Sequence, residues 1–289
     1  MSAPEVPIWA LTHLTHAALQ RTADRVGADV LHVKGPATLR ALRAGPHDST
    51  DADVLVRPAH LTRLIDGMRD DGWTLYTDFA DGSPFGHAAN FSHPSWTYAD
   101  IHRLIPGPLA PAEDVFERLW RDCTTVQIGH RPCTALSPTA QVLMQSLHAA
   151  RSHGTEQSDA WTLCPDDQRD DVRTLADELQ AQTAFAAGIG ELDQHRDAVD
   201  HALWQFWSSP ATDRLDEWSA RLRSAPTLRE KWQVVRRAAR VNRTHLRLRL
   251  DREPTAWDII REQAGRIGHG IRSIWHRLFR TLRRRGRGS

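Results

Sequence analysis

Residues 51–56 read DADVLV, and this stretch constrains the fold more than any other in the chain. The apolar run after the second aspartate is typical of a buried β-strand. Side chains alternate between the two faces of a strand, so Asp51 and Asp53 project from one face and Ala52 and Val54 from the other. The stretch therefore predicts a strand that carries two carboxylates on the same face. By itself, an Asp-x-Asp pair also fits a solvated acidic turn.

Strand and helix patterns alternate around this stretch up to about residue 135. Apolar residues at helical spacing predict helices, short apolar or alternating runs predict strands, and clusters of Gly, Pro and Ser predict turns. On these grounds we expect helices at 4–27, 36–44 and 59–70, strands at 29–33, 51–56, 73–76 and 96–103, and a loop or hairpin at 77–95. This alternation predicts a small mixed β-sheet with flanking helices.

The pattern changes at Ser137-Pro138, an N-cap residue followed by proline at the first helical position. Beyond this point we find only helical patterns, at 138–152, 169–188, 191–207, 212–223, 227–250 and 255–284. The predicted fold class is therefore α+β, with a sheet-containing core at 1–135 and an all-helical C-terminal half at 136–289.

Composition excludes several classes of protein. The net charge is +1, so the chain as a whole is not strongly basic or acidic, and its three cysteines form no C-x-x-C pair. The N-terminus lacks the basic region and apolar run of a signal peptide, and no stretch reaches the roughly 18 apolar residues of a transmembrane helix. We expect a cytoplasmic protein with no transmembrane segment, disulfide framework or structural zinc site.

A third carboxylate, Asp100, shares one face of the strand predicted at 96–103 with His102. If this strand is a neighbour of the one at 51–56, then Asp51, Asp53 and Asp100 converge. Three like charges this close repel strongly, and the arrangement is tolerable mainly when divalent cations lie among them. Mg²⁺ fits because it prefers oxygen ligands, and two such ions about 4 Å apart support an in-line displacement at a phosphate. Mn²⁺ is the alternative ion.

Lys34 and Gly35 precede the helix predicted at 36–44. A glycine at this turn lets backbone amides approach a phosphate, and the N-terminus of a helix favours anions. Lys34 would add charge near a triphosphate, although a cation at the end of a strand also fits an exposed surface position. The pair predicts a site for nucleotide phosphates.

The order of these motifs resembles the uncharacterised nucleotidyltransferase family of the polymerase-β nucleotidyltransferase superfamily. The matching pieces are VKG at 33–35, DADVLV at 51–56, DIH at 100–102, and SP at 137–138 leading into LHAAR at 147–151. The resemblance covers most of the chain and is specific within residues 30–103. It implies a nucleotidyltransferase core capped by helices.

The resemblance also implies roles for particular residues. Asp51 and Asp53 would be the metal pair, and Asp100 would ligate one metal and take the proton of the acceptor. Lys34 and Gly35 would form the nucleotide-facing turn.

His102 matches the family pattern and belongs to the same cofactor-binding set. Two positions depart from the pattern: Pro36 stands where the superfamily usually has Gly or Ser, and His47-Asp48 stands where the family often has an arginine.

The implied activity is the transfer of a nucleoside monophosphate from a nucleoside triphosphate, such as ATP, to an unidentified acceptor with release of pyrophosphate. RNA, a protein side chain and a small molecule all suit this chemistry as acceptors. One alternative is a catalytically inactive core that binds RNA or a partner. A glycosyltransferase that uses Asp-x-Asp is a weaker alternative, because only one strand candidate precedes Asp51.

Other basic positions allow more than one interpretation. The segment 255–284 combines an apolar stripe with many arginines, and a second basic face lies at 236–249. A packed final helix with a basic end fits this composition, and so does contact with an anionic partner such as RNA, an acidic protein or a membrane surface. His148 and Arg151 lie one helical turn apart, where they either reach the nucleotide or belong to an exposed polar face.

Overall fold

The computed structural model describes residues 6–45, 49–81, 83–152, 158–210, 214–241, 246, 249–250 and 252–265. The chain divides into two compact units, Met1–Ala211 and Thr212–Ser289. The predicted change from strands to helices occurs where expected, because the last strand ends at Ala135 and the next helix begins at Pro138. That change lies inside the first unit. The first helices of the C-terminal half therefore belong to the same compact unit as the sheet.

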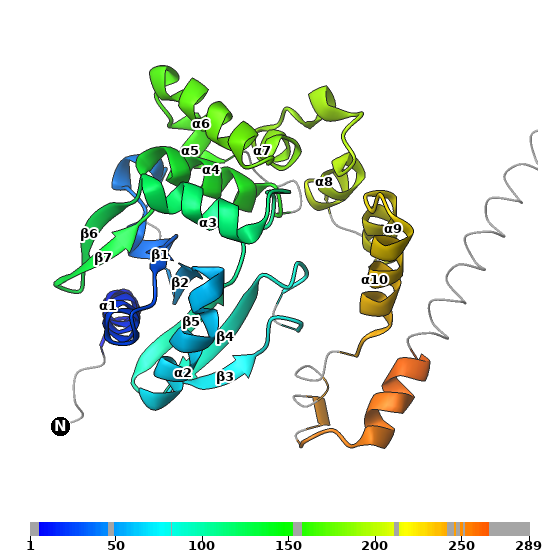
Figure 1. Cartoon of the computed structure of the whole chain (residues 1–289), viewed down its shortest axis with the longest axis horizontal. Coiled ribbons are helices and arrows are strands. Elements are labelled where there is room, and N and C mark those ends of the chain that lie inside the picture. Colours follow the sequence, from blue (N-terminus) through cyan, green and yellow to red (C-terminus); the bar gives the residue numbers. More distant parts are fainter. Residues whose placement is uncertain are drawn as a thin grey trace, which may run out of the picture. The chain divides into compact units, whose positions relative to one another are not determined.

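A seven-stranded mixed sheet forms the centre of the first unit, in the order β3-β4-β5-β2-β1-β7-β6 (Figure 1). The strands are β1 Val30–His32, β2 Asp51–Val56, β3 Thr74–Thr77, β4 Ala88–His93, β5 Trp96–His102, β6 Thr124–Ile128 and β7 Arg131–Ala135. The pairs β2–β5 and β1–β7 are parallel, and the other neighbouring strands are antiparallel. The predicted class, a mixed sheet with flanking helices and a helical C-terminal half, is confirmed.

Helices cover both faces of this sheet. The helices of the first unit are α1 Ile8–Val26, α2 Leu61–Asp70, α3 Ala112–Arg121, α4 Pro138–Ala149, α5 Asp159–Thr162, α6 Asp166–Glu178, α7 Gln182–Ile189 and α8 His201–Trp207. Ala52 and Val54 of β2 lie in one core cluster with residues of α1 and α2, whereas Leu55 lies in another cluster with α3 and α4–α8. The alternation of β2 thus directs its acidic face toward the helices of the second cluster.

The second unit contains α9 Arg214–Arg223 and α10 Leu228–Ala239, which pack against each other. A capping box begins α10: the Thr227 side chain accepts from the Glu230 backbone N–H, and the Glu230 carboxylate accepts from the Thr227 N–H. These two contacts satisfy backbone donors that the first helical turn leaves open. Across the described residues, no helix combines the length and apolar character needed to cross a membrane.

Several predicted helices differ from the structure. The helix predicted at 36–44 is wrong: the chain forms two short 3₁₀ turns, η1 Gly35–Ala37 and η2 Arg40–Leu42. The predicted helix 169–188 is divided into α6 and α7, because the chain turns at Gln180 with φ of 53°.

Two further differences lie later in the chain. The predicted helix 191–207 consists of a 3₁₀ turn, η4 Leu192–His195, and α8. The segment predicted at 255–284 is helical over 256–265, and its remainder lies outside the described residues.

We predict that Gly188→Ala destabilises the first unit, because α7 crosses α4 without room for a side chain. A Cβ at Gly188 would lie 1.9 Å from the Ser146 carbonyl oxygen. Overpacking of this kind typically costs about 1–3 kcal/mol in the free energy of unfolding, measurable by urea denaturation. Gly45→Ala is the matched control, because a Cβ there meets nothing within 4 Å. Equal stability of the two variants would contradict this packing.

Candidate functional site

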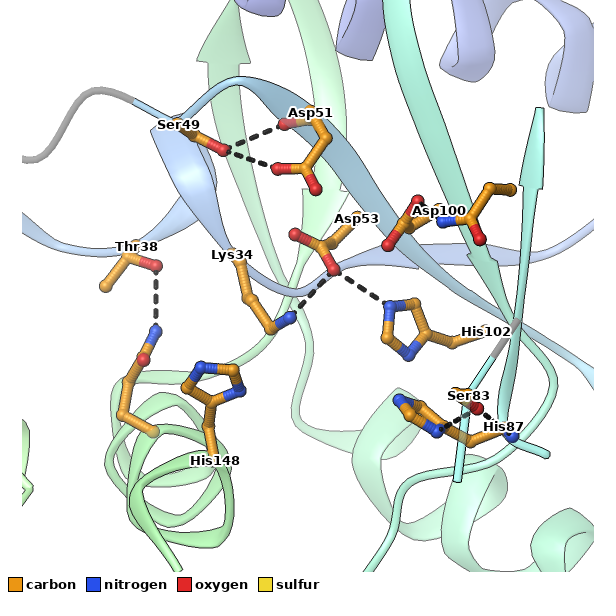
Figure 2. A network of polar contacts seen from close by, with 12 residues as sticks. Lys34, Thr38, Ser49, Asp51, Asp53, Ser83, His87, Asp100, His102 and His148 are labelled. Atoms are coloured by element: carbon orange, nitrogen blue, oxygen red, sulfur yellow. Dashed lines mark hydrogen bonds and ion pairs between the residues drawn. The ribbon is translucent and has the colours of Figure 1, made fainter. Parts of the chain in front are cut away.

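The pairing of two parallel strands brings the predicted acids together. In the register between β2 and β5, Asp53 lies opposite Asp100 and Asp51 lies opposite Tyr98. Figure 2 shows the carboxylates of Asp51, Asp53 and Asp100 on the same side of these strands. The sequence-based expectation that the two strands are neighbours therefore holds in the structure. The catalytic and metal-binding roles of the three residues stay predictions.

Asp53 is the most buried of the three acids, with 3% of its surface exposed. Its Oδ1 atom accepts hydrogen bonds from Lys34 Nζ at 2.8 Å and His102 Nε2 at 2.9 Å (Figure 2). Burial alone would raise the pKa of Asp53, but the Lys34 ammonium and the His102 imidazole hold it well below its usual value. The central carboxylate is thus kept ionised by two neighbouring donors.

The pKa values of the other two acids, Asp51 and Asp100, shift in the opposite direction. Burial and the negative charge of Asp53 raise the pKa of Asp51 and also that of Asp100. Asp51 Oδ1 accepts from Ser49 Oγ at 3.2 Å, and Asp100 Oδ1 accepts from Asn90 Nδ2. The three carboxylates therefore repel one another, and a bound cation would relieve that repulsion.

The donor set fits a divalent cation. Asp53, Asp100 and His102 each offer one ligand atom, and these atoms lie within 4.8 Å of one another. His102 Nε2 points at a carboxylate that only accepts hydrogen bonds, so this nitrogen carries a proton and orients Asp53. The two carboxylates supply the hard oxygen ligands that Mg²⁺ prefers. Asp51 lies outside this compact group of three, two residues before Asp53 on the same face of β2.

The Lys34-Gly35 turn lies at the wall of a pocket of about 530 Å³, which Asp51, Asp53 and His148 also line. Gly35 has φ of 57°, a conformation that favours glycine. The helix expected after it is replaced by the three-residue turn η1, so Gly35 does not begin a long helix. Lys34, with its side chain 22% exposed, is the cation that this turn brings to the acids.

Sequence reasoning missed the side chains that shape this turn. Arg43 donates to the carbonyl oxygens of Gly35 and Thr38, and Gln141 of α4 accepts from the Leu39 backbone N–H at 2.7 Å. No local pattern signals the Gln141 contact, because Gln141 lies about a hundred residues further along the chain.

Ser49 and Asn90 were also missed, although Asn90 lies opposite Asp100 in the β4–β5 register. His47 and Asp48 lie outside the described residues.

A pair of buried histidines, His16 and His32, lies next to the Lys34-Gly35 turn. His16 Nδ1 of α1 lies 2.7 Å from His32 Nδ1 of β1, and His32 Nε2 lies 3.1 Å from Gln20 Oε1. Gln20 donates through its amide nitrogen to Asp24 at 2.7 Å, so its oxygen faces His32 as an acceptor. His32 therefore carries its proton on Nε2, and His16 donates through Nδ1. A Cβ on Gly35 would lie 3.3 Å from His16 Nε2.

This pair predicts a pH dependence of stability. Burial lowers the pKa of His16 to about 4 and that of His32 well below its usual value. The unfolded chain therefore binds more protons than the folded chain between about pH 6.5 and pH 4, so the free energy of unfolding falls as the pH falls through this range. For His16 the full effect is about 3 kcal/mol.

NMR of the histidine ¹³Cε1 resonances measures the pKa of each ring directly, and the His16→Gln variant assigns the His16 signal. We expect His16 to remain neutral at pH 6 and to titrate near pH 4. Titration of both rings near pH 6.5 would contradict the buried pair.

Comparisons with known proteins agree with the motifs. The family model described as uncharacterised nucleotidyltransferase matches residues 12–190. No curated protein matches the chain significantly.

Three similar solved structures are nucleotidyltransferases or resemble them. The lincosamide antibiotic adenylyltransferase LnuA with lincomycin bound is 15% identical, with 55% of this chain and 92% of that chain covered and a TM-score of 0.34. The antibiotic-resistance factor ANT(2'')-Ia is 13% identical, with coverage of 66% and 95% and a TM-score of 0.36. An antigenic nucleotidyltransferase-like protein from Paracoccidioides brasiliensis is 16% identical, with coverage of 62% and 94% and a TM-score of 0.34.

The family match spans more than half of the chain and includes the Lys34-Gly35 turn and all three acids. Both the resemblance stated from the motifs and the predicted enzyme class are therefore confirmed. The chain belongs to the uncharacterised nucleotidyltransferase family.

Proposed function

We propose that this nucleotidyltransferase is metal-dependent and moves a nucleoside monophosphate from a nucleoside triphosphate to an acceptor hydroxyl or phosphate. The observation that carries the proposal is the in-register pairing of Asp53 with Asp100 beside a pocket lined by Lys34. Two carboxylates at this spacing favour a divalent cation, and a nearby ammonium favours phosphate. Metal-dependent nucleotidyl transfer requires both a divalent cation and a bound nucleoside triphosphate.

Asp51, Asp53 and Asp100 are the residues that would hold Mg²⁺, as two ions, or Mn²⁺ in its place. When bound, the cations would spread the negative charge that develops on the transferred phosphate and favour an ionised acceptor oxygen. His102 orients Asp53 through the bond from Nε2, and Ser49 orients Asp51. Orienting contacts of this kind fix the position of ligand oxygens before substrates bind.

The chain's own residues account for the proton and for the leaving group. The acceptor oxygen forms a bond to the α-phosphorus, the bond from the α-phosphorus to the bridging oxygen breaks, and pyrophosphate leaves. Asp100, whose carboxylate lies beside Asp53 on the acidic face of the sheet, takes the acceptor proton. Lys34 Nζ has further N–H groups beyond the one bonded to Asp53, and these would contact the triphosphate.

The acceptor is proposed only by chemical class. Besides the acids, the pocket lining includes the polar side chains of Gln145, Ser152 and Asp159. Such a lining suits a hydroxyl-bearing molecule, so the end of an RNA, a protein side chain and a small metabolite all remain candidate acceptors. The basic C-terminal segment, for which an anionic partner was one of two interpretations, extends beyond the described residues.

Asp53→Asn should reduce transfer by at least about a thousandfold while the protein stays folded, because one carboxylate charge at the centre of the site is lost. The rate of transfer is measured with α-³²P nucleoside triphosphates and Mg²⁺ in a lysate that supplies acceptors. The readout is the amount of label incorporated into acceptors. Asp66→Asn is the matched control: Asp66 is an exposed carboxylate that pairs with Arg69 on α2. Wild-type transfer by the Asp53→Asn protein would overturn the proposed function.

A further inference from the structure

Five basic side chains gather on one side of Asp53, opposite the acids Asp51 and Asp100. They come from four parts of the chain: Lys34 after β1, His87 before β4, His102 at the end of β5, and His148 and Arg151 at the end of α4. The ring centroids of His87 and His102 lie 5.1 Å apart. Figure 2 shows Lys34, His87, His102 and His148 on the other side of Asp53 from the carboxylate of Asp51. Arg151 joins this basic group through its contacts with His87 and His148.

Arg151 is partly buried at the centre of this basic group and has no carboxylate partner in the described part of the chain. Its Nε donates to the Leu147 carbonyl oxygen at 3.3 Å. Its Nη1 lies 3.3 Å from His87 Nε2, and its Nη2 lies 3.3 Å from His148 Nδ1. The guanidinium carbon lies 5.9 Å from the centre of the Phe85 ring. None of the ion pairs within the described residues includes Arg151.

The protons of the two histidines follow from these contacts. A guanidinium only donates hydrogen bonds, so His87 Nε2 and His148 Nδ1 must both accept. His87 then carries its proton on Nδ1, 2.7 Å from Ser83 Oγ, and His148 carries its proton on Nε2. Burial and the neighbouring charges of His102 and Arg151 lower the pKa of His87 to about 2, so this ring stays neutral. Two neutral rings thus hold Arg151 without cancelling its charge.

A count of donors shows what Arg151 keeps available. The guanidinium has five N–H groups. Among the described residues, the contacts with Leu147, His87 and His148 use three of them, which leaves one N–H on each terminal nitrogen. One N–H on each terminal nitrogen suffices to contact two oxygens of a phosphate, and a partly buried cation without a counter-charge is unfavourable until such an anion binds.

We propose that Arg151, oriented by His87 and His148, binds the terminal phosphate of the nucleoside triphosphate. His148 lines the same pocket as Lys34, Asp51 and Asp53, and Arg151 contacts His148, so the basic group adjoins the wall of this pocket. With the α-phosphate beside the acids, the β- and γ-phosphates extend past Lys34 toward Arg151. His148 Nε2–H is a further donor for the terminal phosphate. This inference rests on the proposed function for the identity of the nucleotide.

Calorimetric titration of the full-length protein with ATP, AMP and tripolyphosphate in the presence of Ca²⁺ tests the proposal. A charge-assisted bidentate contact corresponds to a roughly 10–100-fold change in affinity. Arg151→Gln should weaken ATP and tripolyphosphate binding by that factor and leave AMP binding unchanged, and Arg151→Lys should restore only part of the loss. Arg196→Gln is the control, because Arg196 is an exposed arginine of the first unit that pairs with Asp193. It should match the wild type with every ligand.

The results separate this inference from the proposed function. Unchanged ATP and tripolyphosphate affinity in folded Arg151→Gln protein would overturn the inference, as would equal weakening of ATP and AMP or a wild type that does not bind tripolyphosphate. If tripolyphosphate binding depends on Arg151 but no nucleotide is transferred, the terminal-phosphate site stands and the proposed function fails. If transfer proceeds with an ATP affinity independent of Arg151, only the inference fails.

Discussion

The parallel pairing of β2 with β5 is the constraint around which the site is built. Its register sets Asp53 directly beside Asp100, and the alternation of β2 adds Asp51 on the same face. Carboxylates in such positions repel one another. Two hydrogen-bond donors next to the central carboxylate, Asp53, offset part of this repulsion. Lys34 and His102 both bond to Asp53, which keeps this carboxylate ionised while the pKa values of Asp51 and Asp100 rise. Residual repulsion of this kind is what a divalent cation relieves.

The two layers of helices contribute differently to the site. On one face, α1 packs on the sheet and carries His16, which holds His32 beneath the Lys34-Gly35 turn. On the other face, α4 runs beside the pocket and supplies side chains along its length. Gln141 and Gln145 bond to the irregular segment after Gly35, and His148 lines the pocket beyond them. The segment that carries the nucleotide-facing turn is therefore held between two helices that are far apart in sequence.

Periodicity in the sequence predicted the strands that carry chemistry. The DADVLV stretch forms β2 over residues 51–56, and β5 ends at His102 within the predicted strand 96–103. These predictions succeed for two reasons: β2 is buried along nearly its whole length and appears as a continuous apolar run, whereas β5 partly alternates between buried and more exposed residues. That the two strands are neighbours was an assumption, since pairing depends on contacts between distant segments. The resemblance to a family supplied the chemical meaning of the acids, which the two-residue spacing alone did not.

The helix predicted at 36–44 failed for a reason that local patterns do not contain. Arg43 occupies the carbonyl oxygens of Gly35 and Thr38, and Gln141 occupies the Leu39 N–H, so side chains replace the backbone bonds of a helix. Sequence spacing placed His148 near Arg151, but the contact with His87 was hidden, because His87 precedes β4 in a stretch predicted only as a loop or hairpin. Contacts that shape a polar site come from several elements, whereas sequence patterns report one element at a time.

Anomalous diffraction from crystals of the protein grown with Mn²⁺ and a nucleoside triphosphate is the most direct measurement of the central claim. The account predicts manganese peaks within bonding distance of the Asp53 and Asp100 carboxylates, with the triphosphate on the Lys34 side of the metal. Nucleotide bound in the pocket with no metal at either carboxylate would contradict it.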